Sequence, residues 1–309
     1  MSQSVRIRSF FAIVGLAVCG LTAPSYADTL TGTLKKISDT GTMTIGIRQA
    51  LLPFSYYDNN QKVVGYSADL CKHVVQAVKD KLGLKALNVR EMAVTSATRI
   101  PLLSNGTIDM ECGATTNNAE RVQQVAFSYT HFVTSNTFVS KKKNGFAKLE
   151  DLKGKAVASV AGTSNIRELQ ELSGARALNI RVIAVKDHAE AFLMVETDRA
   201  AAFVMDDVIL AGYVSNAKDP SEYEISKEVL SVQPYGFMVS RGDPAFKNVV
   251  DDALASVFKS KEMNAIYTKW FESPIPPSGN NLNMPMSESL KRILQKPTDS
   301  ADPADYIAD

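Results

Sequence analysis

The sequence predicts an α/β protein in which β-strands and helices alternate in two successive series. The first series runs from a β-rich stretch at 42–47 to a strand at 109–113, and the second from a strand at 156–160 to one at 201–205. The repeated order of strand and helix is typical of a mostly parallel sheet flanked by helices. A length of 309 residues, 45% of them hydrophobic, is sufficient for two domains.

Local patterns predict the individual elements. Leu70, Val74 and Val78 recur four residues apart and predict a helix at 67–82. The other expected elements are strands at 88–94, 109–113, 156–160, 181–185, 201–205 and 223–226, extended stretches at 135–142 and 233–240, and helices at 100–103, 244–259, 262–271 and 287–294, with further helices after the strands of the second series. The polar and acidic end of the chain, 297–309, is predicted to be disordered.

The first residues have the pattern of a secretion signal. Two arginines precede an apolar run at 10–21, and Ser-Tyr-Ala at 25–27 supplies small residues before a cleavage point. We therefore predict that residues 1–27 are a signal peptide for the Sec pathway. A lipoprotein anchored at Cys19 is the weaker alternative, because Val18 is large where a small residue is expected.

A polar segment at 111–121 predicts a strand, a turn and the start of a helix. Asn117 and Glu120 have the spacing of a capping box, and Arg121 lies one turn inside the expected helix. An arginine there can lean back toward the free N–H groups of the first turn, where Thr116 adds a hydroxyl. Such a group of donors would bind a carboxylate. The alternative is an ordinary capped helix with a surface arginine.

A similar pattern, Thr-Ser-Asn-x-x-Glu at 163–168, repeats the cap after a strand of the second series. Ligands of open parallel sheets bind beyond the carboxyl ends of the strands. Polar residues expected at such ends are Arg48, Ser96, Arg99, Thr116, Ser164, His188 and Asp206. One polar residue after a strand is usually a cap or part of a turn, but this number, with Arg121 as a third arginine, predicts a binding site.

Two cysteines remain once Cys19 has left with the signal peptide. Cys71 lies in the helix expected at 67–82, and Cys112 lies in the strand before the polar segment. An even pair in an exported protein predicts one disulfide. The alternative is two buried free thiols.

A resemblance to a known family rests on eight segments: 53–58, 64–67, 99–103, 111–118, 151–155, 186–188, 205–207 and 269–271. Together they resemble the periplasmic amino-acid-binding proteins of ABC importers, in particular the glutamate/aspartate-binding branch. The likeness covers the chain from the predicted cleavage point to about Pro297. Leu-Lys-Gly-Lys at 152–155 is common in solute-binding proteins, whereas the combination of Arg48, Arg99, Arg121 and His188 is much more specific.

The resemblance implies the two-lobed periplasmic-binding-protein fold of type II, with two hinge strands between lobes that close on a ligand. Lobe 1 would comprise 28–134 and 237–296, lobe 2 with the hinge strands 135–236, and the disordered tail 297–309.

The resemblance also implies a role for each site residue. The α-carboxylate of the ligand would bind Arg121, Thr116 and Ser164, and its ammonium would bind Asp206 with help from position 114. The side-chain carboxylate would bind Arg48, Ser96, Arg99 and His188. One position departs from the pattern, because the close relatives have Ser where this chain has Ala114. Loss of that hydroxyl would weaken binding by roughly 0.5–1.5 kcal/mol.

The implied ligand is L-glutamate or L-aspartate, and the implied partners are ABC permease subunits in the inner membrane. The protein would be a periplasmic monomer without a cofactor, a metal or a nucleic-acid partner. The net charge of +1 likewise gives no sign of a nucleic-acid-binding surface. Binding of another polar amino acid, or a role as a sensor module, stays open. A dehydratase-like enzyme on the same scaffold is less favoured, because no Ser/His/Asp or Cys/His constellation appears and the three histidines lack metal-ligand spacing.

Overall fold

The computed structural model describes Met1 and residues 30–307. The signal peptide predicted at 1–27 and the alternative anchor at Cys19 therefore lie outside the described residues. Within the described part, no helix combines the length and the apolar character needed to cross a bilayer.

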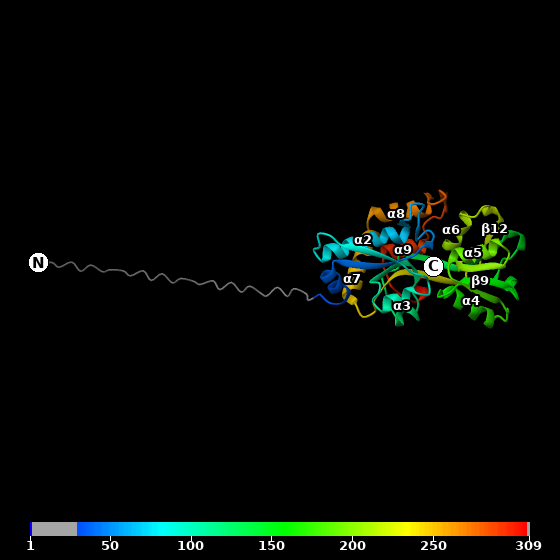
Figure 1. Ribbon diagram of the computed structural model, residues 1–309, viewed down its shortest axis with the longest axis horizontal. Helices are drawn as coiled ribbons and strands as arrows, with labels where there is room; N and C mark the ends of the chain where they lie inside the picture. The colour runs from blue at the N-terminus through cyan, green and yellow to red at the C-terminus, as the bar shows by residue number, and fades with distance from the viewer. Residues whose placement is uncertain (2–29, 308–309) are drawn as a thin grey trace. The chain divides into compact units, whose positions relative to one another are not determined.

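Two groups of elements within the compact unit that starts at Thr31 are called lobe 1 and lobe 2 here (Figure 1). Lobe 1 has the parallel strands β1 (Thr42–Ile47), β5 (Asn88–Ala93) and β6 (Met110–Thr116), in the order β5-β1-β6. Lobe 2 has the parallel strands β9 (Ala156–Val160), β10 (Arg181–Val185) and β11 (Ala202–Asp206), in the order β10-β9-β11. The predicted α/β class with two successive series is confirmed.

Two long strands, β8 (Phe132–Lys141) and β13 (Ser231–Val239), connect the lobes and are called the crossing strands. They pair with each other in antiparallel fashion from Phe132 to Asn136 and from Ser231 to Tyr235. Beyond that segment, β8 pairs with β11 of lobe 2 and β13 pairs with β6 of lobe 1. Both were expected as extended stretches. The predicted lobe boundaries at 135 and 237 fall inside these strands and remain a prediction.

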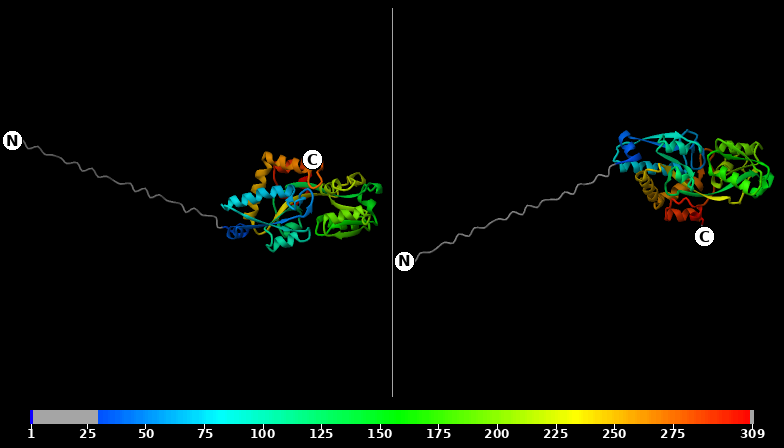
Figure 2. Two further views of the ribbon diagram at one scale, coloured as in Figure 1. Left: turned by 45° about the horizontal axis from the view of Figure 1, so that its top comes forward. Right: turned by 90° about the horizontal axis from the view of Figure 1, so that it is seen from below.

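All of these strands belong to one ten-stranded sheet, and helices flank its strands in each lobe. In both views of Figure 2 the orange and red C-terminal helices lie with the blue and cyan elements of lobe 1. Lobe 1 carries α1 (Gly32–Thr40), α2 (Tyr66–Lys81), α3 (Arg99–Ser104), η1 (Arg121–Gln123), α7 (Pro244–Phe258), α8 (Lys261–Phe271), α9 (Glu288–Gln295) and η5 (Pro303–Tyr306). Lobe 2 carries η2 (Lys142–Asn144), η3 (Leu149–Leu152), α4 (Ser164–Ala175), α5 (His188–Glu196), α6 (Asp207–Ser215) and η4 (Pro220–Glu222). The short strands are β2 (Ala50–Leu51), β3 (Ser55–Tyr57), β4 (Val63–Val64), β7 (Ala126–Phe127), β12 (Tyr223–Ile225), β14 (Pro274–Ile275) and β15 (Asn280–Asn281). Helix α1 and the strands β2 to β4 are not among the elements predicted from the sequence.

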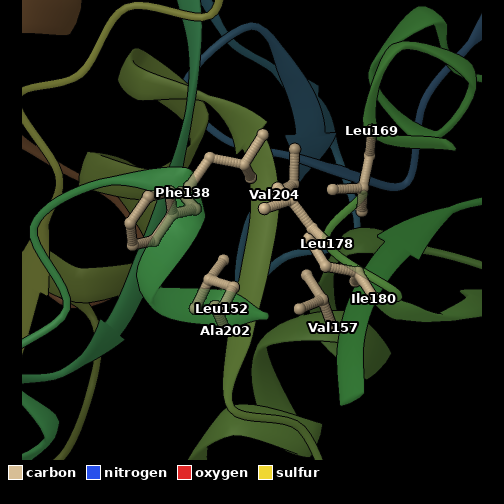
Figure 3. Close-up of a cluster of buried hydrophobic side chains, with 9 residues drawn as sticks. Phe138, Leu152, Val157, Leu169, Leu178, Ile180, Ala202 and Val204 are labelled. Atoms are coloured by element: carbon tan, nitrogen blue, oxygen red, sulfur yellow. The ribbon is translucent and has the colours of Figure 1, made fainter. Parts of the chain in front are cut away.

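The core of lobe 2 packs α4 against the sheet, and Figure 3 shows its side chains converging between these elements. Leu169 of α4 contacts a cluster that includes Val157 of β9 and Val204 of β11, and all three side chains are fully buried. Truncating a leucine in such a core typically destabilises a protein by about 2–5 kcal/mol. This packing fixes the N-terminus of α4 relative to the strand ends.

The cap predicted at Asn117 and Glu120 is wrong. A three-residue 3-10 helix, η1, follows β6 instead of an α-helix, and the side chain of Asn118 accepts the N–H of Arg121 at 2.9 Å. Glu120 pairs with Arg167 of lobe 2. The chain turns into β7 immediately after η1, so an amphipathic helix cannot continue there.

The second predicted cap is wrong as well. The N-cap of α4 is Thr163, whose hydroxyl accepts the N–H of Ile166. Asn165 and Glu168 turn inward instead and bind Asn136 of β8. Threonine is a preferred N-cap residue as well, although it ranks below asparagine, so spacing alone did not distinguish the two positions.

The disorder predicted for 297–309 is wrong for the described residues up to 307. Tyr306 is buried, and its hydroxyl lies 2.9 Å from the hydroxyl of Thr130. The N–H of Thr130 donates to the carbonyl of Thr298 at 2.8 Å, and Asn117 donates to the carbonyl of Asp299 at 2.8 Å. Tertiary contacts with the start of β8 and the end of β6 thus order a segment whose composition alone indicates a flexible tail.

A disulfide joins Cys71 of α2 to Cys112 of β6, as predicted. It bridges the helix and the strand over 41 residues of sequence. Closing such a loop in the unfolded chain removes conformational entropy from that state.

We predict that replacing both cysteines by alanine lowers the free energy of unfolding by about 2–4 kcal/mol, because the loop is no longer closed in the unfolded chain. Urea unfolding measures this change. The wild-type protein kept in a reducing agent is the matched control and should lose a similar amount. Equal stability of the oxidised and reduced wild-type protein would contradict the prediction.

Candidate functional site

Eight of the nine predicted binding residues line one small cavity between the lobes: Arg48, Ser96, Arg99, Ala114, Thr116, Ser164, His188 and Asp206. The ninth, Arg121, is buried next to it and donates to the carbonyl of Thr116 at 2.9 Å. The cavity volume is about 10 Å³, close to the space that one water molecule needs.

The site lies at the carboxyl ends of six parallel strands, three from each lobe. In lobe 1, Arg48 follows β1, Ser96 follows β5, and Thr116 ends β6. In lobe 2, Ser164 opens α4 after β9, and His188 opens α5 after β10. Asp206 is the last residue of β11. Strand ends that meet at one edge of each sheet explain why residues so distant in sequence converge.

Arginines dominate the lobe 1 side of the site. The side chains of Arg48, Arg99 and Arg121 are only 5%, 3% and 3% exposed, respectively. The Nη2 of Arg48 donates to the hydroxyl of Ser96 at 3.0 Å, and the Nη1 of Arg99 donates to the hydroxyl of Thr115. These bonds hold the guanidinium groups in place.

Burial changes the protonation equilibria of these arginines. Burial, and then the charge of Arg99, lower the pKa of Arg48 to about 10 and that of Arg121 to about 9. Burial lowers the pKa of Arg99 as well. At neutral pH the guanidinium groups of Arg48 and Arg121 stay charged, because both pKa values remain above 7. A bound anion would relieve the unfavourable burial.

Asp206 and His188 dominate the lobe 2 side. The carboxylate of Asp206 accepts from Asn165 at 2.7 Å and from the hydroxyl of Tyr235. Burial raises its pKa to about 7, although both hydrogen bonds oppose the shift. Burial, Arg48 and Arg99 lower the pKa of His188 well below its usual value, so the imidazole is neutral.

The lobes contact each other directly around the site. Arg121 donates from Nη2 to the carbonyl of Gly162 in lobe 2 at 3.2 Å, and the hydroxyls of Thr116 and Ser164 lie 3.3 Å apart. Farther out, the hydroxyl of Tyr213 in α6 donates to the carbonyl of Ala50 in β2 at 2.6 Å. These interlobe contacts describe a closed arrangement.

Gly162 of lobe 2 lies close to the backbone of lobe 1. Its φ is +79°, and a Cβ at this position would lie 2.6 Å from the Cα of Ala97 and 2.8 Å from the carbonyl carbon of Ser96. Real Cβ atoms do not approach backbone atoms so closely, so the absence of a side chain lets the lobes meet here.

Several residues of the site are not among those predicted from the sequence. Asn165, Leu51, Met205 and Ile209 also line the cavity. The sequence predicts Asn165 as a helix cap and Tyr235 only as part of an extended stretch. The aliphatic residues gave no signal, because apolar residues in strands and helices normally belong to the core.

A family of known proteins matches this chain over residues 43–273 and is described as bacterial extracellular solute-binding proteins, family 3. An L-glutamate/L-aspartate-binding protein of Pseudomonas aeruginosa is 48% identical over 298 residues, which cover 96% of this chain and 99% of the relative. A glutamate/aspartate import solute-binding protein of Escherichia coli K12 is 44% identical and covers 94% of this chain and 97% of its own length.

Solved structures show the same fold. An ancestral arginine-binding protein bound to arginine aligns with a TM-score of 0.68 and 29% sequence identity. The alignment covers 75% of this chain and 98% of the ancestral protein.

We predict that Asp206→Asn makes the ligand-free protein more stable at about pH 8, by roughly 1–3 kcal/mol. The pKa of the Asp206 carboxyl is about 7 in the folded protein, compared with 3.8 for an unperturbed aspartate, which stands for the unfolded chain. Between these two pH values the folded state therefore binds a proton that the unfolded state does not. The wild-type protein therefore loses stability as the pH rises through this window, and the amide variant does not.

Urea unfolding at about pH 5 and pH 8 checks this prediction, and the gain should be smaller at the lower pH. Asp252→Asn, which alters an exposed acid of α7, is the control and should show no such pH dependence. A variant that is less stable than the wild type at both pH values would contradict the prediction.

Proposed function

Because the chain belongs to the bacterial extracellular solute-binding proteins of family 3, we propose that it captures L-glutamate and L-aspartate and delivers them to an ABC importer. Two relatives that match almost the whole chain are named as proteins that bind glutamate and aspartate or serve in their import. The observation that carries the proposal is the meeting of three buried arginines of lobe 1 with the strand ends of lobe 2. The chain is a binding protein and not an enzyme.

The binding scheme assigns the two carboxylates of the ligand to different arginines. Arg121, with the hydroxyls of Thr116 and Ser164, would bind the α-carboxylate. The two hydroxyls lie 3.3 Å apart across the lobes, and Arg121 donates to the carbonyl of the same threonine. A guanidinium forms two parallel hydrogen bonds with a carboxylate, which adds geometric specificity.

The side-chain carboxylate would lie between the other two arginines. Arg48 is held by Ser96 at 3.0 Å, and Arg99 lies close enough to Arg48 to lower its pKa. Neutral His188 would donate an N–H from lobe 2. The like charges of Arg48 and Arg99 favour an anion at this position and disfavour the neutral amide of glutamine.

Asp206 would bind the ammonium group. An ammonium beside it would lower the pKa of Asp206 from about 7, which supports full ionisation in the complex. Ala114 offers no hydroxyl and would contribute its backbone carbonyl.

Closure of the lobes would couple binding to delivery. Only about 10 Å³ remain between the lobes in this ligand-free arrangement, so a ligand would enter an open form. The lobes would then close around the ligand, less tightly than they meet here. We further propose a periplasmic location, supported by the predicted signal peptide, a monomeric state, and permease subunits of the inner membrane as partners.

Titration calorimetry with glutamate, aspartate and glutamine tests the proposed function. We expect one molecule of either diacid per protein chain and binding of glutamine that is weaker by a few kcal/mol, on the order of the penalty for an unpaired buried polar group. Glutamine binding as tight as that of glutamate would refute the proposed ligand class.

We predict that Arg99→Ala weakens glutamate binding by about 2–5 kcal/mol, because the distal carboxylate loses a buried charged partner. The loss for glutamine should be much smaller. Arg90→Ala removes an exposed arginine of β5 in the same lobe and should change neither affinity. Equal losses for both ligands in the Arg99 variant would mean that Arg99 does not contact the distal group.

We predict that Gly162→Ala weakens glutamate binding by about ten- to a hundredfold, or about 1.4–2.8 kcal/mol, because the new Cβ keeps the lobes apart. Calorimetry measures the affinity, and small-angle X-ray scattering with saturating glutamate should give a larger radius of gyration than for the wild type.

Gly154→Ala is the matched control for that variant. Gly154 has a similar φ of +70°, but a Cβ there would meet nothing within 4 Å. Both variants therefore strain the backbone of lobe 2, and only one obstructs closure. If the two variants bound glutamate equally well, backbone strain alone would explain any loss.

A further inference from the structure

Glu111 lies beside the site, yet the proposed binding scheme gives it no role. Its side chain on β6 is fully buried. One carboxylate oxygen accepts the hydroxyl of Thr115 at 2.8 Å. The other lies 3.9 Å from the Nη1 of Arg99 and forms no hydrogen bond within the part of the chain that the structure describes. A buried carboxylate with so few partners is costly for the fold and calls for a functional explanation.

The backbone makes room for this carboxylate. A Cβ on Gly113 would lie 2.1 Å from the Oε1 of Glu111 and 3.3 Å from the Cγ of Arg48. The missing side chain therefore lets the carboxylate lie across the strand, between Arg48 and Arg99. Because Arg99 donates to the hydroxyl of Thr115, and Thr115 donates to Glu111, a continuous chain of polar contacts links the acid to the distal arginine.

The charge of Glu111 acts on all three arginines. Burial lowers the pKa of Arg48, Arg99 and Arg121, and the negative charge of Glu111 opposes this effect in each case. At about pH 8, above the pKa of about 7 of Asp206, three cations with the two acids Glu111 and Asp206 leave the site with one net positive charge. Glutamate and aspartate each carry two carboxylates and one ammonium, and so have one net negative charge.

We propose that Glu111 is a positioning residue and a fixed counter-charge that matches the site to a ligand of one net negative charge. It holds Arg99 through Thr115 and offsets one of three buried cations, so that the ligand-free site stays folded. In doing so it reduces the preference of the site for an anionic over a neutral side chain. This inference rests on the proposed function.

Glu111→Gln tests the charge alone, since the amide has the same shape and can still accept from Thr115. At about pH 8, calorimetry gives the dissociation constants of glutamate and glutamine, and their ratio is the readout. Without the negative charge of Glu111, the arginines attract the side-chain carboxylate of glutamate more strongly, whereas the neutral amide of glutamine gains no such attraction. We expect the ratio of the glutamine constant to the glutamate constant to rise about tenfold. The ligand-free variant should also melt at a lower temperature.

Asp109→Asn is the matched control. Asp109 is a buried acid directly before the same strand, but it binds Lys36 at 2.7 Å and the N–H of Thr44 at 2.8 Å, away from the arginines. Its removal should lower stability and leave the ratio unchanged. Gly113→Ala keeps every charge but displaces the Glu111 carboxylate, so the ratio should rise in the same direction by less.

The outcomes separate this inference from the function on which it rests. Wild-type binding of glutamate, with an unchanged or lower ratio in both the Glu111 and the Gly113 variant, overturns the counter-charge role alone. The Gly113 variant keeps the test valid if Glu111→Gln does not fold. A wild-type protein that binds neither amino acid would refute the proposed function and this inference together.

Discussion

The repulsion and desolvation of three buried guanidinium groups is the constraint on which the site depends. Arg48, Arg99 and Arg121 have almost no contact with water in this closed arrangement. Such burial is unfavourable unless anions or hydrogen-bond acceptors compensate for it. Glu111, the carbonyls of Thr116 and Gly162, and the hydroxyls of Ser96 and Thr115 supply part of that compensation. An amino acid with two carboxylates would supply the remainder, so affinity and closure have the same physical origin.

Much of the fold and most of the site could be predicted, because both follow from rules that act locally. Alternating strands and helices fix a parallel sheet, and parallel strands collect the residues at their carboxyl ends on one edge. Arg48, Ser164, His188 and Asp206 therefore could be assigned to one site before any contact between them was known, and the cavity lining agrees. The crossing strands were visible as extended stretches, although pairing between them requires partners about a hundred residues apart.

The failures occurred where tertiary contacts override local preference. Asn165 has the spacing of a cap, but its amide bridges Asn136 and Asp206, and Thr163 caps the helix instead. The segment after Thr116 turns within three residues of 3-10 helix, because β7 must return to pair with β13. Tyr306 is buried against Thr130 in a stretch whose composition favours disorder. In each case the deciding partner lies far away in sequence.

The discontinuous path of the chain determines the order in which its parts can fold. Lobe 2 consists of one continuous stretch between the crossing strands, whereas the sheet of lobe 1 gains β13 only after lobe 2 has been synthesised. The last hydrogen bonds of lobe 1 join Thr130 and Asn117 to residues near 300. A chain that emerges from its N-terminus can therefore complete lobe 2 first, while the early half of lobe 1 exposes unpaired apolar surface until the C-terminus arrives. That interval is when a chaperone would have most to protect.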